Sequence, residues 1–144
     1  MSLTLKQTLP SNINAPTSNN SKSHQFEVSE LKEHESSIVS HVQAHISSGG
    51  TIVSLPSYVY TTSKSGIRFI SSGDVTFKMF KITEHQSTQL DRAKTIEKAA
   101  LAPINPTPQD RSVSILAQAL ASLALKSLNE QRDDQVGHNI DVNV

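Results

Sequence analysis

Cysteine is absent from this chain of 144 residues, and tyrosine and phenylalanine together supply an aromatic content of only 4%. Without cysteine the protein has no disulfide, no thiolate metal ligand and no catalytic thiol, which fits a reducing compartment. The apolar content of 35% is low beside the roughly 45–50% of ordinary globular domains. We therefore expect that part of the chain is unfolded or that a partner completes the fold.

Net charge and long apolar runs are missing as well. Thirteen basic side chains balance thirteen acidic ones, so no overall field draws the protein toward nucleic acid or a membrane surface. The strongest apolar stretch, residues 113–128, is interrupted by polar side chains and is shorter than the roughly 20 residues that span a bilayer. The N-terminus lacks the charged start and apolar run of a signal peptide. We expect an intracellular, cytoplasmic protein without membrane insertion.

The length favours one core, because two cores in a chain of this size would each be close to the lower limit of independent stability. Residues 1–23 are mostly polar and have no apolar periodicity, so they are predicted to form a disordered arm. Residues 24–130 are predicted to form a single α+β domain. Residues 131–144 are predicted to be a flexible tail, although their spaced valines and isoleucine leave an added strand open.

A helix is predicted over residues 29–47, where apolar side chains recur at spacings of three and four, and Gly49 with Gly50 can end it. The following stretch is rich in β-branched and aromatic residues and in turn formers, with a turn expected at residues 71–74. Connections this short favour antiparallel pairing. The predicted strands are residues 51–55, 58–62, 67–70 and 75–82.

Two further helices are predicted toward the C-terminus. The first begins near Thr83, where residues 83–86 have the spacing of a capping box, and it ends before Pro103. The second begins with Thr107 as cap, and Asp110 follows where its charge suits the helix dipole. The predicted fold is therefore α+β, with a small antiparallel sheet of three to four strands flanked by one N-terminal and two C-terminal helices.

The last helix carries apolar side chains over more than half of its circumference. An arc this wide exceeds what one contact with a small sheet covers. We therefore predict a non-enzymatic interaction or assembly protein that is a homo-oligomer through this helix or that binds another protein. Small chains with polar arms, no cysteine and an oligomerising helix are common among accessory and structural proteins of viruses and phages. A viral or phage accessory or structural role is therefore one expectation. The predicted interface consists of Val113, Leu116, Leu120, Leu123 and Leu128.

Three histidines follow one stripe of the first helix: His34, His41 and His45. His41 and His45 have the spacing at which two imidazoles on a helix can coordinate one metal ion. Helical zinc pairs in hydrolases place a glutamate after the first histidine, however, and here Val42 stands there. We expect a solvated flank and no metal site, with joint protonation of the three imidazoles as a pH sensor left as an alternative.

Aromatic and basic residues gather in the predicted sheet, and this combination suits single-stranded nucleic acid because rings stack on bases and cations neutralise phosphates. The ordinary explanation is that strands prefer aromatic residues and that lysines keep sheet edges soluble. Nucleic-acid binding is therefore the alternative function. The residues predicted to contribute are Tyr58, Tyr60, Arg68, Lys78 and Lys81.

No catalytic motif accompanies these features. The sequence has no nucleophile elbow, no phosphate-binding glycine loop and no dinucleotide fingerprint. An enzyme built on His41, His45 or His85 would lack a nucleophile, an acid–base pair and a cofactor loop. We therefore predict no catalytic residues and no cofactor.

Overall fold

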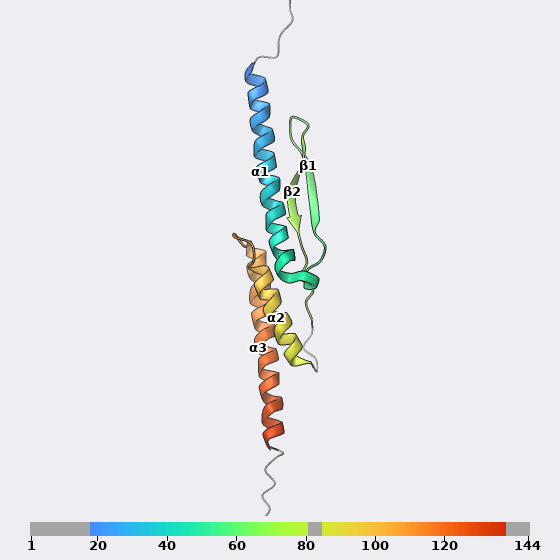
Figure 1. The fold of residues 1–144 in the computed structure, drawn as a ribbon, viewed down its shortest axis with the longest axis vertical. Coiled ribbons are helices and arrows are strands. Elements are labelled where there is room, and N and C mark those ends of the chain that lie inside the picture. Colours follow the sequence, from blue (N-terminus) through green and yellow to red (C-terminus); the bar gives the residue numbers. More distant parts are fainter. Residues whose placement is uncertain (1–17, 81–84, 138–144) are drawn as a thin grey trace, which may run out of the picture.

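The computed structural model describes residues 18–80 and 85–137. Helix α1 and a β-hairpin lie side by side, and the end of α1 meets an antiparallel pair of helices, α2 and α3 (Figure 1). The predicted α+β class is confirmed. The elements are α1 (Ser18–Gly49), the 3-10 turn η1 (Gly50–Ile52), β1 (Ser57–Thr62), β2 (Arg68–Asp74), α2 (Gln86–Ala100) and α3 (Pro108–Gly137).

Helix α1 begins well before the predicted position. Residues 18–23, which were predicted to belong to a disordered arm, are helical, so that part of the prediction is wrong. Extending an existing helix adds one hydrogen bond for each ordered residue and avoids the cost of nucleation. The remainder of the predicted arm, residues 1–17, lies outside the described residues. The end of α1 is as predicted, because Gly50 follows it with a positive φ of 54°.

The sheet has two strands, and the prediction of three to four is wrong. β1 and β2 form an antiparallel hairpin with an irregular register between Val59 and Tyr60. The predicted turn at residues 71–74 lies within β2. Within the described residues, the segments predicted as outer strands meet at one bridge, between Val53 and Phe77. The 3-10 turn precedes this bridge, and a tight turn in which Met79 N–H donates to the Phe77 carbonyl follows it, so the pairing ends after one bridge.

Side chains of α1 hold the hairpin in place. The Glu35 carboxylate accepts the Ile70 N–H over 2.6 Å at the irregular part of the hairpin. A Cβ at Gly73 would lie 2.9 Å from Ile38 Cγ2 and equally close to the Tyr58 ring. Glycine therefore allows the end of β2 to approach α1 closely, and this approach brings residues 73–77 near the C-terminal half of α1.

Helix α2 starts at Gln86, after the predicted start near Thr83, which lies outside the described residues, and His85 makes no side-chain cap bond. Helix α3 starts as predicted. The Asp110 N–H donates to Thr107 Oγ1 over 3.1 Å, while the Thr107 N–H donates to Asp110 Oδ2 over 2.7 Å. The helix continues to Gly137, so residues 131–137 are not the predicted flexible tail. Residues 138–144, including the suggested added strand, lie outside the described residues.

The hydrophobic core lies where the end of α1, the Val53–Phe77 bridge and the helix pair meet. Buried alanines let the helices approach closely, and several are entirely inaccessible to solvent. In the described ranges, no helix is long and apolar enough to cross a membrane. The core cluster is Val53, Phe77, Ile96, Ala99, Ala100 and Ala117.

Candidate metal centre

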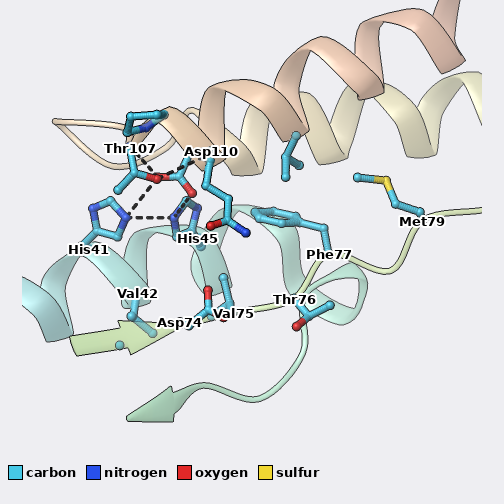
Figure 2. A pocket seen from close by; sticks show the side chains of 14 residues that line it. His41, Val42, His45, Asp74, Val75, Thr76, Phe77, Met79, Thr107 and Asp110 are labelled. Carbon is cyan, nitrogen blue, oxygen red and sulfur yellow. Dashed lines mark hydrogen bonds and ion pairs between the residues drawn. The ribbon is translucent and has the colours of Figure 1, made fainter. Parts of the chain in front are cut away.

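Two imidazoles and one carboxylate from different helices converge at the edge of the core. His41 and His45 lie one turn apart on α1, and Asp110 lies in the first turn of α3. Figure 2 shows the three side chains pointing toward one another. Among the described residues they form a group whose ligand atoms, one from each residue, all lie within 4.8 Å of one another.

The distances within this group are close to those of a metal coordination shell. His41 Nε2 lies 3.1 Å from His45 Nε2. Asp110 places Oδ2 3.2 Å from His41 Nε2 and Oδ1 3.2 Å from His45 Nε2. Ligand atoms around a tetrahedral zinc ion with bonds of about 2.0–2.1 Å are roughly 3.3–3.4 Å apart. A small outward shift of the three groups would therefore admit such an ion.

Outer contacts orient two of the three groups, His45 and Asp110. His45 Nδ1–H donates to the Ala99 carbonyl over 2.8 Å, and the Phe77 ring packs edge to face against the same imidazole. In the neutral tautomer that makes this bond, His45 presents a bare Nε2 lone pair to the cluster. The N-terminal cap holds Asp110 through Thr107. Metal-binding histidines in proteins are oriented in this way by a carbonyl or carboxylate on the other ring nitrogen.

The cluster has more lone pairs than protons. When both rings are neutral, His41 can donate one Nε2–H, whereas His45 Nε2 and both Asp110 oxygens can only accept. The 3.2 Å contact between His45 Nε2 and Asp110 Oδ1 then brings two acceptors together with no hydrogen between them. Such a contact is unfavourable unless a cation or an additional proton lies between the two atoms. A divalent ion would satisfy both acceptors at once.

The expectation of a solvated histidine flank does not hold for His45, which is only 2% exposed. The expectation of no metal site stays a prediction, and the geometry of these three side chains offers a candidate site beside it. Sequence reasoning identified the His41–His45 spacing and identified Asp110 as a cap residue. It did not predict that Asp110 contacts the two histidines, because nothing in the sequence between residues 45 and 110 indicates that α3 starts beside α1.

A family comparison matches nearly the whole chain. The model of the SprA-related family covers residues 6–143. The chain belongs to the SprA-related family. No curated protein and no solved structure showed a significant match. The name of this family specifies no reaction.

A groove of about 630 Å³ runs beside the cluster in this SprA-related protein. One wall is residues 73–77 with Met79, the other is the start of α3, and His41 and His45 lie between them (Figure 2). The groove makes the cluster accessible, because the His41 side chain keeps 26% of its surface exposed. The two carboxylates in the lining are Asp74 and Asp110, and the lining has no lysine or arginine.

The residues predicted for self-association in this family member have unequal environments. Val113 packs against the core cluster, and Leu120 and Leu128 are half-buried. Leu116 and Leu123 are 49% and 53% exposed. Part of the predicted interface is therefore used within the chain, and two leucines one heptad apart are left on the outer side of α3.

The structure brings together two of the residues predicted to bind nucleic acid. The Arg68 guanidinium lies 4.5 Å from the centre of the Tyr60 ring on the exposed hairpin. Tyr58 is half-buried and faces Gly73, and the Lys78 ammonium donates to the Thr51 carbonyl. Lys81 lies outside the described residues. Nucleic-acid binding stays a prediction, as do the viral or phage role and the cytoplasmic location.

Proposed function

We propose that this chain is a non-enzymatic module that binds one divalent transition-metal ion through His41, His45 and Asp110. The observation that supports this most strongly is the oriented His45 ring. Its Nδ1–H is taken up by Ala99, and its Nε2 faces a carboxylate oxygen with no hydrogen of its own to donate. Two imidazoles and one carboxylate form a ligand set that suits zinc and neighbouring first-row ions.

Three protein ligands leave a fourth coordination position, and the adjoining groove gives access to it. Three-ligand sites of this kind often support hydrolysis when a glutamate beside the first histidine acts as general base. The corresponding residue is Val42, which is 1% exposed and packs in the core. We therefore infer ion binding without hydrolysis by that route.

The ion would join separate parts of the fold. His41 and His45 belong to α1 and Asp110 to α3, while Ala99, which accepts the His45 hydrogen bond, lies in the last turn of α2. An ion that binds the folded state and not the unfolded chain stabilises the fold by mass action. Metal loading is thus expected to fix the junction between α1 and the α2–α3 pair.

Isothermal titration of the full chain with Zn²⁺, after removal of bound metal with a chelator, tests the proposal. One ion should bind per chain, and the unfolding midpoint should rise with free Zn²⁺. The Co²⁺ form should show the intense visible absorption of tetrahedral cobalt. His41→Ala should weaken Zn²⁺ binding at least tenfold.

His85→Gln is the matched control, because His85 is exposed and makes no side-chain cap bond. It should bind Zn²⁺ like the unaltered chain. If His41→Ala and the unaltered chain bind Zn²⁺ equally, the metal proposal is wrong. Nitrogen NMR that shows both His45 ring nitrogens protonated at neutral pH, with no change on adding Zn²⁺, would establish a proton in place of the ion and would also overturn it.

Self-association through α3 is a second candidate function, and the exposure of Leu116 and Leu123 supports it. The two side chains lie seven residues apart and so share one face of the helix. The α3 helix also runs on beyond the start of α2 (Figure 1). Two chains could therefore pack their α3 helices along this face.

Light scattering coupled to size-exclusion chromatography tests this candidate. The unaltered chain should elute as an oligomer at micromolar concentration, and Leu116→Asp combined with Leu123→Asp should elute as a monomer. Leu55→Asp is the control, because Leu55 is 90% exposed and belongs to the segment between η1 and β1 and not to α3. A monomer already in the unaltered chain would exclude self-association at that concentration.

A further inference from the structure

One edge of the extended segment after β2 has backbone groups without partners. Val53 and Phe77 form an antiparallel bridge in which the bonds are made by their neighbours: Ser54 N–H donates to the Thr76 carbonyl, and Lys78 N–H donates to the Ile52 carbonyl. In this pattern the bridged residues direct their own N–H and C=O groups away from each other. The free side of Phe77 therefore faces away from residues 52–54.

Val75 has the same orientation, because backbone groups in an extended chain repeat their direction every second residue. Thr76 N–H donates to Ser54 Oγ. Among the described residues, no hydrogen bond involves the N–H or C=O of Val75 or the N–H of Phe77. The Val75 N–H, the Val75 C=O and the Phe77 N–H are thus free along one edge of the segment, with the spacing of a β-strand.

Val75 and Phe77, which carry these free groups, are among the residues that line the groove of about 630 Å³ beside the His41–His45–Asp110 cluster. The opposite wall contributes Pro108 and Val113, and Met79 contributes further apolar surface. A groove with apolar walls and a row of unpaired backbone groups is the arrangement in which proteins accept an additional strand.

We propose that this groove binds an extended peptide segment of a partner protein, which pairs as a strand with Val75 and Phe77. One peptide residue exchanges two hydrogen bonds with Val75, and a further peptide carbonyl accepts the Phe77 N–H. This pairing uses the backbone edge, so it stands whether or not the neighbouring cluster holds an ion.

The charge of the groove indicates which peptides fit. Asp74 lies at one end of the lining, is exposed and forms no ion pair in the described part of the chain. The lining has no lysine or arginine, so the Asp74 charge is not balanced within the groove, with or without an ion at the cluster. A segment with lysine or arginine beside an alternating β-branched stretch is therefore the preferred partner.

Amide hydrogen exchange measured by NMR tests the pairing. The probe is an acetylated and amidated peptide of six alternating threonine and valine residues with a lysine at each end. Saturation with this peptide should slow exchange at the Val75 and Phe77 amides at least tenfold. Exchange at the Thr76 and Lys78 amides should change little, because these amides already have partners.

Two N-methylated peptides provide the control for the peptide. Methylation of the amides along the pairing edge should abolish protection, whereas methylation along the other edge should leave it intact. Asp74→Asn should weaken binding of the lysine-flanked peptide severalfold, and Asp91→Asn, an exposed carboxylate on α2, should not.

The proposal is overturned if the peptide does not bind at millimolar concentration. It is equally overturned if the peptide changes the NMR chemical shifts of groove residues but does not slow amide exchange at Val75 and Phe77. That result would indicate binding by side chains alone. The titrations are run with a chelator and with Zn²⁺. A chain that binds peptide but no zinc would disprove only the metal site, and a chain that binds zinc but no peptide would disprove only the strand pairing.

Discussion

His45 on α1 donates its Nδ1–H to the carbonyl of Ala99, in the last turn of α2, over 2.8 Å. The Ala99 carbonyl lies in the last turn, where carbonyls lack the usual helical partner, and it also accepts the Ala102 N–H over 3.3 Å. The bond from His45 also sets which nitrogen of His45 faces Asp110. A single contact between two helices therefore stabilises their packing and prepares a ligand atom for the candidate metal centre.

Asp110 has two roles that substitution can separate. Asp110→Asn keeps an oxygen that can accept the Thr107 N–H, but it removes the charged ligand, so Zn²⁺ affinity should fall at least tenfold. Thr107→Ala removes the hydroxyl that accepts the Asp110 N–H and should lower the free energy of unfolding by about 1 kcal/mol with little loss of Zn²⁺ affinity. Calorimetric titration and denaturant unfolding of both variants check this. Equal losses of zinc affinity would contradict the assignment of Asp110 as a ligand.

Gly49 is needed for close packing at the end of α1. A Cβ there would clash with Val53 Cγ2 and would lie 3.0 Å from Ala99 Cβ. Gly49→Ala should therefore lower the free energy of unfolding by about 1–3 kcal/mol, as measured by urea denaturation. Gly50→Asn is the matched control, since a Cβ at Gly50 meets nothing within 4 Å and asparagine tolerates positive φ. A loss at Gly50 as large as at Gly49 would point to backbone strain in place of packing.

Ile96 is the largest wholly buried apolar side chain and belongs to the core cluster. Ile96→Ala should cost about 2–5 kcal/mol, because it removes buried methyl groups and leaves a cavity. Ile104→Ala should change the free energy of unfolding by less than about 0.5 kcal/mol, since Ile104 is 97% exposed. Thermal and urea unfolding measure both. Similar values for the two variants would be inconsistent with a core at the α1–α2 contact.

Glu27 should titrate below its ordinary range. Hydrogen bonds to its charged form lower the pKa of the Glu27 carboxyl. The largest effect comes from the Ser65 hydroxyl and the next largest from the Ser63 hydroxyl. A lowered pKa means that this contact favours the folded state above the ordinary pKa and is lost as pH falls through the lowered value. Carboxyl NMR titration should show the Glu27 pKa rising toward its ordinary value in Ser65→Ala. An unchanged pKa in that variant would refute the contact as its cause.

Local signals in the sequence were sufficient for features held by neighbouring residues. Gly49 and Gly50 mark the end of α1, and the Thr107–Asp110 spacing marks the start of α3, because cap bonds join residues three or four positions apart. The strands of the sheet were harder to predict from the sequence. Residues 51–55 and 75–82 have strand-like composition, but whether they pair depends on backbone groups that the intervening hairpin brings together. In the part of these segments that the structure describes, one bridge forms, between Val53 and Phe77.

By itself, the sequence determined the α+β class, the absence of thiol chemistry and the placing of His41 and His45 on one helical face. Periodicity and residue type suffice for these, since each is a local property of the chain. Only the tertiary structure decided that Asp110 meets those histidines and that Val75 and Phe77 leave an edge unpaired. Both depend on how helices and strands pack, and packing joins residues whose separation along the chain carries no periodic signal.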